Sequence, residues 1–129
     1  MKIIGIDYGR KKIGLAIGDT QSKFAEPLSV IRFKSEAQAF IQIGELVMVE
    51  KVEKIVLGVS EGKMAQETRK FGQKLQKELG IPIIFQDETL TSLDAQELSI
   101  AAGINRKKRR EMEDAYAASI ILQNFLGNL

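Results

Sequence analysis

The chain has no cysteine, no histidine and no tryptophan among its 129 residues. These absences exclude a disulfide framework, thiolate or imidazole zinc sites, and any Ser-His or Cys-His nucleophile. Metal chemistry would have to use oxygen ligands, which favours Mg²⁺ or Mn²⁺. No apolar run is long enough to span a bilayer, and the apolar N-terminus reaches an aspartate too early for a signal peptide. We therefore expect a cytoplasmic protein with no membrane partner.

The composition is that of an ordinary globular protein, with 44% apolar and 28% charged residues. The length predicts a single domain, residues 1–129, large enough to bury a core. The net charge of +2, from 19 basic and 17 acidic residues, does not by itself indicate a nucleic-acid binder. The distribution of the basic residues along the chain carries more information.

Five apolar runs have the lengths and the boundaries of β-strands. Short connections join the first three runs, which predicts an antiparallel meander. A helical segment precedes each of the last two, and such crossovers make these strands parallel to the first. The predicted strands are residues 2–7, 12–17, 28–33, 55–59 and 81–86.

Four helices complete the pattern. Ser35 and Gln38 have the spacing of a capping box, and Gly80 with Pro82 ends the second helix. The predicted helices are residues 35–51, 63–79, 91–102 and 109–126. The order predicts an α/β fold with a mixed five-stranded sheet, in which the first three strands are antiparallel and helices cover both faces.

Acidic residues stand where two of the predicted strands end. Asp7 closes a strand that is apolar beyond Lys2, and the pair Asp87-Glu88 follows the fifth strand. Ligands of open α/β sheets bind at the carboxyl ends of the strands, which favours a functional role for Asp7 over that of a turn residue. The Asp87-Glu88 pair is explained equally well as capping residues before a helix.

Asp114 heads the apolar stripe of the last predicted helix. A carboxylate directed toward a core is costly unless a positive group pairs with it, and a position near a helix start suits a negative charge. We interpret Asp114 as functional, the alternative being a first-turn aspartate on the solvated rim. The residues that follow it at helical spacing are Ala117, Ala118, Ile121, Leu122 and Phe125.

These acidic positions converge on one edge of the predicted sheet. Converging carboxylates repel each other and are tolerated when divalent cations bind between them. Two hard cations about 3.5–4 Å apart can hold a phosphodiester, activate a water and stabilise the leaving oxygen, with no histidine base. The residue inventory therefore permits metal-dependent phosphodiester hydrolysis.

Three segments in order resemble the bacterial YqgF family of ribonuclease H-like nucleases, whose members are described as Holliday junction resolvases and as pre-16S ribosomal RNA nucleases. The segments are DYGRKKIGLAIGD (7–19), DETLTS (87–92) and EDAYAASIILQNFL (113–126). The resemblance covers nearly the whole chain and implies a ribonuclease H-like fold. It also implies catalytic roles for Asp7, Glu88 and Asp114. The implied metal ligands are Asp7, an acidic residue at Asp87-Glu88, with Glu88 preferred, and Asp114.

The chain departs from the family pattern at two places. Thr89 stands where the family usually has arginine, and the segment 58–62 replaces a Gly-Leu-Pro-like turn. The first change removes a candidate phosphate-binding cation, and the second alters a candidate substrate loop. Neither removes a candidate ligand.

Two basic runs flank the acidic positions in the sequence. A charge run is usually a solvated face, but this placement favours contacts with nucleic-acid phosphates, and no aromatic residues are interleaved for base stacking. The predicted nucleic-acid contacts are Arg10, Lys11, Lys12, Arg106, Lys107, Lys108, Arg109 and Arg110. We expect an RNA precursor as the substrate, with branched DNA as the alternative, and a monomer or a weak homodimer.

The sequence has features of two other functions. The segment 4–9 with 14–17 resembles the first phosphate loop of actin-like sugar kinases and chaperone ATPases, but one domain cannot supply the second lobe that clamps the nucleotide. A catalytically degenerate nucleic-acid-binding module is the other alternative, and Thr89 is the feature that supports it.

Overall fold

The computed structural model describes residues 1–87 and 106–129, with the side chains of the last helix described from residue 111 onward. The predicted helix 91–102, Glu88 and Thr89 lie outside the described residues. None of the described helices combines the length and the apolar character needed to cross a membrane. The described elements are β1 Lys2–Tyr8, β2 Lys12–Asp19, β3 Phe24–Arg32, α1 Glu36–Glu50, β4 Val52–Val59, α2 Lys63–Leu79, β5 Ile83–Asp87 and α4 Arg106–Gly127.

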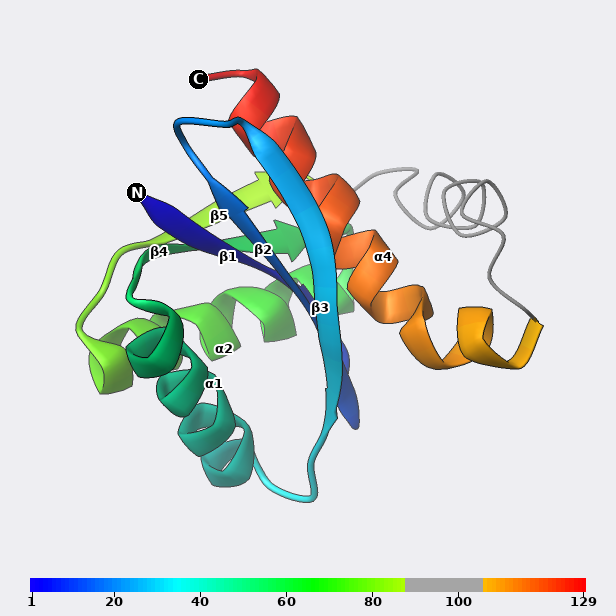
Figure 1. The fold of residues 1–129 in the computed structure, drawn as a ribbon. Coiled ribbons are helices and arrows are strands. Elements are labelled where there is room, and N and C mark those ends of the chain that lie inside the picture. The colour runs from blue at the N-terminus through cyan, green and yellow to red at the C-terminus, as the bar shows by residue number, and fades with distance from the viewer. Residues whose placement is uncertain (88–105) are drawn as a thin grey trace.

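The five strands form one sheet in the order β3-β2-β1-β4-β5. The first three strands are antiparallel neighbours, while β4 runs parallel to β1 and β5 parallel to β4. This is the predicted mixed sheet. The carboxyl ends of β1, β4 and β5 consequently lie at the same edge, next to the turn that joins β1 to β2 (Figure 1).

The third strand begins at Phe24 and not at Leu28, as the apolar pattern had predicted. Pro27 lies inside it, although proline has no N–H to donate to a neighbouring strand. The proline is tolerated because β3 is an edge strand and because the register with β2 shifts between Leu15 and Ala16. The strand prediction failed here because the proline and the polar residues around it concealed four strand residues.

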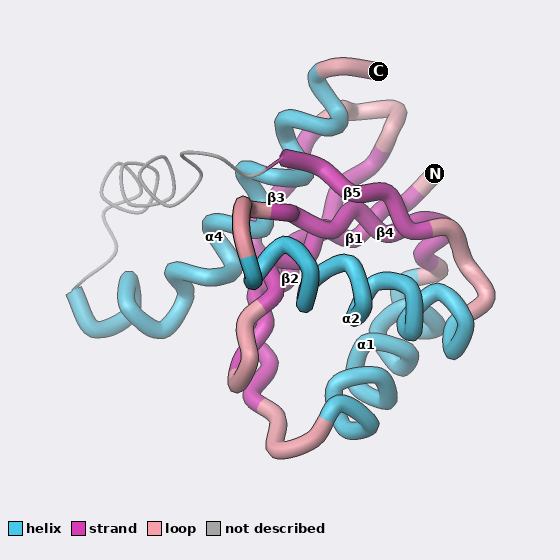
Figure 2. The backbone as a smooth tube through the Cα atoms, turned by 180° about the vertical axis from the view of Figure 1, so that it is seen from behind, coloured by secondary structure: helices cyan, strands magenta, loops and turns pink. Residues whose placement is uncertain are grey.

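Both faces of the sheet are covered, as predicted. Helices α1 and α2 pack on one face around Phe71 and Leu75, and α4 packs on the other around Ile121 and Leu122 (Figures 1 and 2). Successive residues of a strand point to opposite faces. In β1, Ile4 and Ile6 accordingly join the first cluster, whereas Ile3 joins the second.

The helix ends follow the predicted capping chemistry. Ser35 accepts a hydrogen bond from the Gln38 N–H at 3.3 Å, and the Gln38 side chain accepts one from the Lys34 N–H at 2.8 Å. Gly80 ends α2 in the left-handed conformation with φ 69°, which glycine adopts without a steric penalty. These caps fix where α1 begins and α2 ends.

Small residues let α4 approach the sheet closely. A Cβ at Gly5 would lie 2.8 Å from the Leu122 Cβ, and one at Gly18 would lie 2.9 Å from the Leu126 Cδ1. A Cβ at Gly14 would overlap the carbonyl of Asp114. The backbone of α4 therefore lies directly on β1 and β2, which brings Asp114 to the sheet surface.

Candidate metal and nucleic-acid site

Asp7 and Asp114 meet at Gly14. Gly14 is the register partner of Asp7 across β1 and β2, and directly opposed residues of antiparallel strands lie about 4.5–5.5 Å apart between Cα atoms. The same glycine contacts the backbone of Asp114. Alternation places Asp7 on the face that α4 covers, together with Gly5. Two of the residues predicted to be catalytic are thus brought to the same face of the sheet at the carboxyl end of β1.

The Asp114 carboxylate is partly buried and faces one cation. Its side chain is 26% exposed, but its Oδ2 atom is buried and accepts no hydrogen bond from the described residues. The Lys12 Nζ lies 3.0 Å from this oxygen, so the compensation is the ammonium charge and not a well-oriented hydrogen bond. The structure confirms that a positive group accompanies Asp114, and that group is Lys12.

The alternation of side chains along β5 decides the face of the sheet on which Asp87 lies. Phe85 lies on the α2 face of the sheet, where it contacts Gly72, and Asp87 shares that face because it is two residues further along. Asp7 lies on the opposite face. The position of Glu88 is outside the described residues. As a metal ligand, Asp87 is on the less favourable face, and the preference for Glu88 stays a prediction.

Within the described residues no group of three acidic side chains is placed to hold a metal ion. Asp7 and Asp114 supply carboxylate oxygens, the donors that Mg²⁺ and Mn²⁺ prefer. The buried Asp114 Oδ2 accepts no well-oriented hydrogen bond from the described residues and has the Lys12 ammonium beside it, so it is an acceptor that a hard cation would satisfy in place of that ammonium. The residues present therefore fit a divalent cation, with Glu88 as the candidate for the third carboxylate.

Arg10, a predicted phosphate contact, is held by Glu67 on α2. Its Nε and Nη2 donate hydrogen bonds of 2.9 and 2.8 Å to the two carboxylate oxygens. These hydrogen bonds lower the pKa of Glu67, and Lys70 lowers it further. Burial, followed by the charges of Glu67 and Glu36, raises the pKa of the neighbouring Tyr8. The guanidinium is fixed beside the end of β1 by bidentate hydrogen bonding to a carboxylate. A phosphate could accept the same pair of hydrogen bonds.

The structure describes the side chains of two of the other predicted nucleic-acid contacts and only the backbone of the remaining five. Lys11 is exposed in the turn after β1, and Lys12 lies beside Asp114. The backbone of residues 106–110 forms the first turns of α4, which begins three residues earlier than predicted. This run therefore leads directly into the turn that carries Asp114, and its role in binding stays a prediction.

Glu67 and Gly14 are site residues that the sequence reasoning missed. Glu67 gave no local signal, because its partner Arg10 is 57 residues away. A signal for Gly14 was present in the period-two series of small residues Gly14, Ala16 and Gly18. Such a series on one face of a strand indicates a close approach of another backbone.

Comparison with known proteins gives consistent matches over the whole chain. The protein of Lactococcus lactis subsp. lactis is 38% identical over 97% of this chain and 93% of its own. The protein of Caldanaerobacter subterraneus subsp. tengcongensis is 40% identical over 98% and 96%. Both are named "Putative pre-16S rRNA nuclease".

The fold also matches solved structures of low sequence identity. Thermus thermophilus RuvC in complex with a Holliday junction substrate superposes with a TM-score of 0.63 at 16% identity, covering 99% of this chain and 94% of that one. The fowlpox virus Holliday junction resolvase gives 0.63 at 13% identity, with coverages of 99% and 99%. These likenesses establish the ribonuclease H-like fold. The RuvX family, described as Holliday junction resolvase, matches residues 1–128, and this chain belongs to that family, the same family that its YqgF-like motifs indicated.

Proposed function

We propose that this protein is a metal-dependent nuclease that hydrolyses nucleic-acid phosphodiesters, and that its substrate is the precursor of 16S ribosomal RNA. The observation that carries the proposal is the meeting of Asp7 and Asp114 at Gly14, with a buried carboxylate oxygen that accepts no hydrogen bond from the described residues. The family match and the names of the relatives support the same activity.

Asp7 and Asp114 would hold the metal, with Glu88 completing the set. A divalent cation held by these carboxylates would supply the Lewis-acid chemistry that phosphodiester hydrolysis needs. Gly14 keeps the two carboxylates together because any side chain there would push α4 away from β2. Arg10, beside α2, and Lys12, beside α4, provide positive charge near the end of β1 that carries Asp7. There they can orient a phosphate.

An RNA precursor is preferred because one active site per chain suits cleavage of a single strand. A resolvase must cut two opposed strands, which normally requires a symmetric dimer with two active sites. On α4, the apolar side chains of Ala118, Ile121, Leu122 and Leu126 are already used against the sheet. The relatives' names point the same way. Processing of ribosomal RNA also agrees with the cytoplasmic location expected from the sequence.

Resolution of four-way DNA junctions is the second candidate. The family is described by that activity, and one helix carries apolar side chains that a dimer could cover. On α1, Ile41 is 61%, Met48 80% and Val49 75% exposed. An interface of that kind is what two-strand cleavage needs.

The test is side-by-side incubation of the purified protein with a 16S precursor fragment and an immobile four-way DNA junction, each with Mn²⁺ and with EDTA. We expect cleavage of the RNA that depends on Mn²⁺, and an elution volume typical of a monomer. Symmetrical nicking of the junction without RNA cleavage, together with a stable dimer, would establish the second candidate. Binding without cleavage of either substrate would favour the degenerate binding module.

A further inference from the structure

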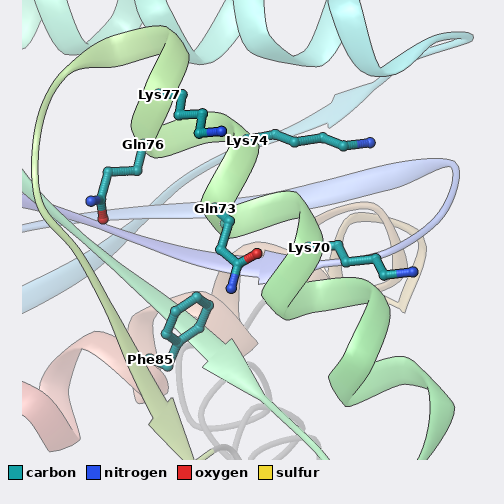
Figure 3. A pocket seen from close by; sticks show the side chains of 7 residues that line it. Lys70, Gln73, Lys74, Gln76, Lys77 and Phe85 are labelled. Carbon is teal, nitrogen blue, oxygen red and sulfur yellow. The ribbon is translucent and has the colours of Figure 1, made fainter.

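A groove of about 360 Å³ lies between α2 and the edge strand β5, away from the carboxylates. Its sides come from α2 and its floor includes the Phe85 ring (Figure 3). Three lysines project from one stripe of the helix at intervals of four and three residues. These lysines are Lys70, Lys74 and Lys77, with Gln73 and Gln76 beside them.

The floor of the groove is held firmly. The Gln76 side chain accepts a hydrogen bond from the Ile83 N–H at 3.2 Å, which ties α2 to the start of β5. A Cβ at Gly72 would lie 2.8 Å from the Phe85 ring, so the helix backbone rests on that ring. The Arg69 guanidinium lies over the same ring, 5.2 Å from its centroid. The lysines thus project from a fixed surface and not from a loop.

The lysine stripe continues to the catalytic edge. Lys63 begins α2, and the pair formed by Arg10 and Glu67 lies between it and Lys70, whose charge acts on Glu67. Arg10 in turn is only three residues after Asp7. From Lys63 to Lys77 the helix rises about 21 Å at 1.5 Å per residue. We call this surface, made of Lys63, Arg10, Lys70, Lys74 and Lys77, the α2 ridge.

Two carboxylates beside the ridge are already paired with its cations. Glu67 binds Arg10 through both of its oxygens. The Lys74 Nζ lies 3.2 Å from the Glu36 Oε1 on α1, and the side chains of Lys74 and Glu36 are 61% and 41% exposed. An exposed pair of this kind contributes little to stability, so Lys74 can exchange Glu36 for another anion at small cost. Against the five cations of the ridge stand Glu67, Glu36 and Glu78 at the end of α2, which leaves an excess of positive charge.

We propose that the α2 ridge binds the phosphate backbone of a single nucleic-acid strand that extends from the cleavage site. The proposal rests on the proposed nuclease function. Separate, flexible ammonium groups on one helical stripe suit successive phosphates, which are read as charge without base selection. At the roughly 3.4 Å per nucleotide of a strand stacked as in a duplex, the ridge corresponds to about six nucleotides, and to fewer for an extended strand.

The test compares the wild type with Lys70→Gln/Lys74→Gln/Lys77→Gln in binding to labelled single strands of 4 to 16 nucleotides in EDTA, where nothing is cut. Glutamine keeps the helix propensity of lysine. For the wild type we expect affinity to rise with length up to about six nucleotides at most. In the variant we expect that gain to disappear. We also expect the magnitude of the slope of log K against log salt to decrease by about 2, because each of the three lost phosphate contacts contributes roughly 0.7.

The matched control is Lys2→Gln/Lys23→Gln/Lys54→Gln, which removes the same charge at the amino-terminal ends of β1, β3 and β4. We expect it to keep the wild-type length dependence and salt slope. Equal losses in both triple variants would mean that only net charge matters, and would overturn the proposal. A wild type that fails to bind single strands would overturn it too. Because cleavage is not measured, loss of the nuclease function alone would leave these readouts intact.

Discussion

Replacement of Lys12 by methionine tests the role of this lysine as the counter-ion of the Asp114 carboxylate in the metal-free protein. The Lys12 Nζ lies 3.0 Å from the buried Asp114 Oδ2, and the Lys12 side chain is 41% exposed. At an effective dielectric constant of about 20 the Coulomb attraction is roughly 5–6 kcal/mol. Desolvation and lost side-chain entropy offset most of it, which leaves about 1 kcal/mol for so exposed a pair.

A cation that binds Asp114 must first displace this ammonium group. Lys12→Met should therefore lower the free energy of unfolding of the metal-free protein by about 1 kcal/mol, or roughly 4 °C in Tm. It should tighten the Kd for Mn²⁺ about fivefold, the factor that corresponds to 1 kcal/mol. The two effects have opposite signs, because the lysine stabilises the carboxylate only while no metal is bound.

The assay is thermal unfolding at a series of Mn²⁺ concentrations, since a ligand of the native state raises its stability by an amount that yields Kd. Lys11→Met is the matched control, because it removes the same charge from the neighbouring exposed position. We expect the control to change neither quantity. If Lys12→Met leaves the Mn²⁺ affinity unchanged, or if both variants tighten it equally, Lys12 is not the counter-ion of a metal ligand and the reasoning is refuted.

Three further variants test the site. Asp7→Asn should abolish cleavage and raise the metal-free Tm slightly, since it removes a repelling charge; wild-type turnover in this variant would exclude Asp7 as a ligand. Gly14→Ala should destabilise the fold by about 1–3 kcal/mol in urea unfolding, because its Cβ would overlap the Asp114 carbonyl. Gly127→Ala, where a Cβ meets nothing within 4 Å, should cost almost nothing. Neutralising Arg106 and Arg110 should weaken binding to all sequences alike and reduce the salt slope by about one unit for each lost contact; an unchanged slope would mean that the run is only solvated.

The sequence by itself determined the order and type of the elements that the structure describes. Periodicity located α2 at its observed ends, since its apolar stripe is regular and Gly80 stops it. The capping box at Ser35 located the start of α1 to within one residue. The two helical crossovers predicted that β4 and β5 run parallel to β1. The apolar residues that follow Asp114 at helical spacing predicted which face of α4 meets the sheet. These features depend on near neighbours in the chain, which is why they can be read without coordinates.

Only the tertiary structure decided which charged groups meet. Lys12 and Asp114 are 102 residues apart and Arg10 and Glu67 are 57 apart, and no local pattern predicts either pair. The face occupied by Asp87 likewise depends on the register of β5 against β4. Close contact at Gly14 required both the small residues of β2 and the small residues of α4. A candidate active site of this kind is made by packing between distant segments, and its geometry exists only once the two faces of the sheet are covered.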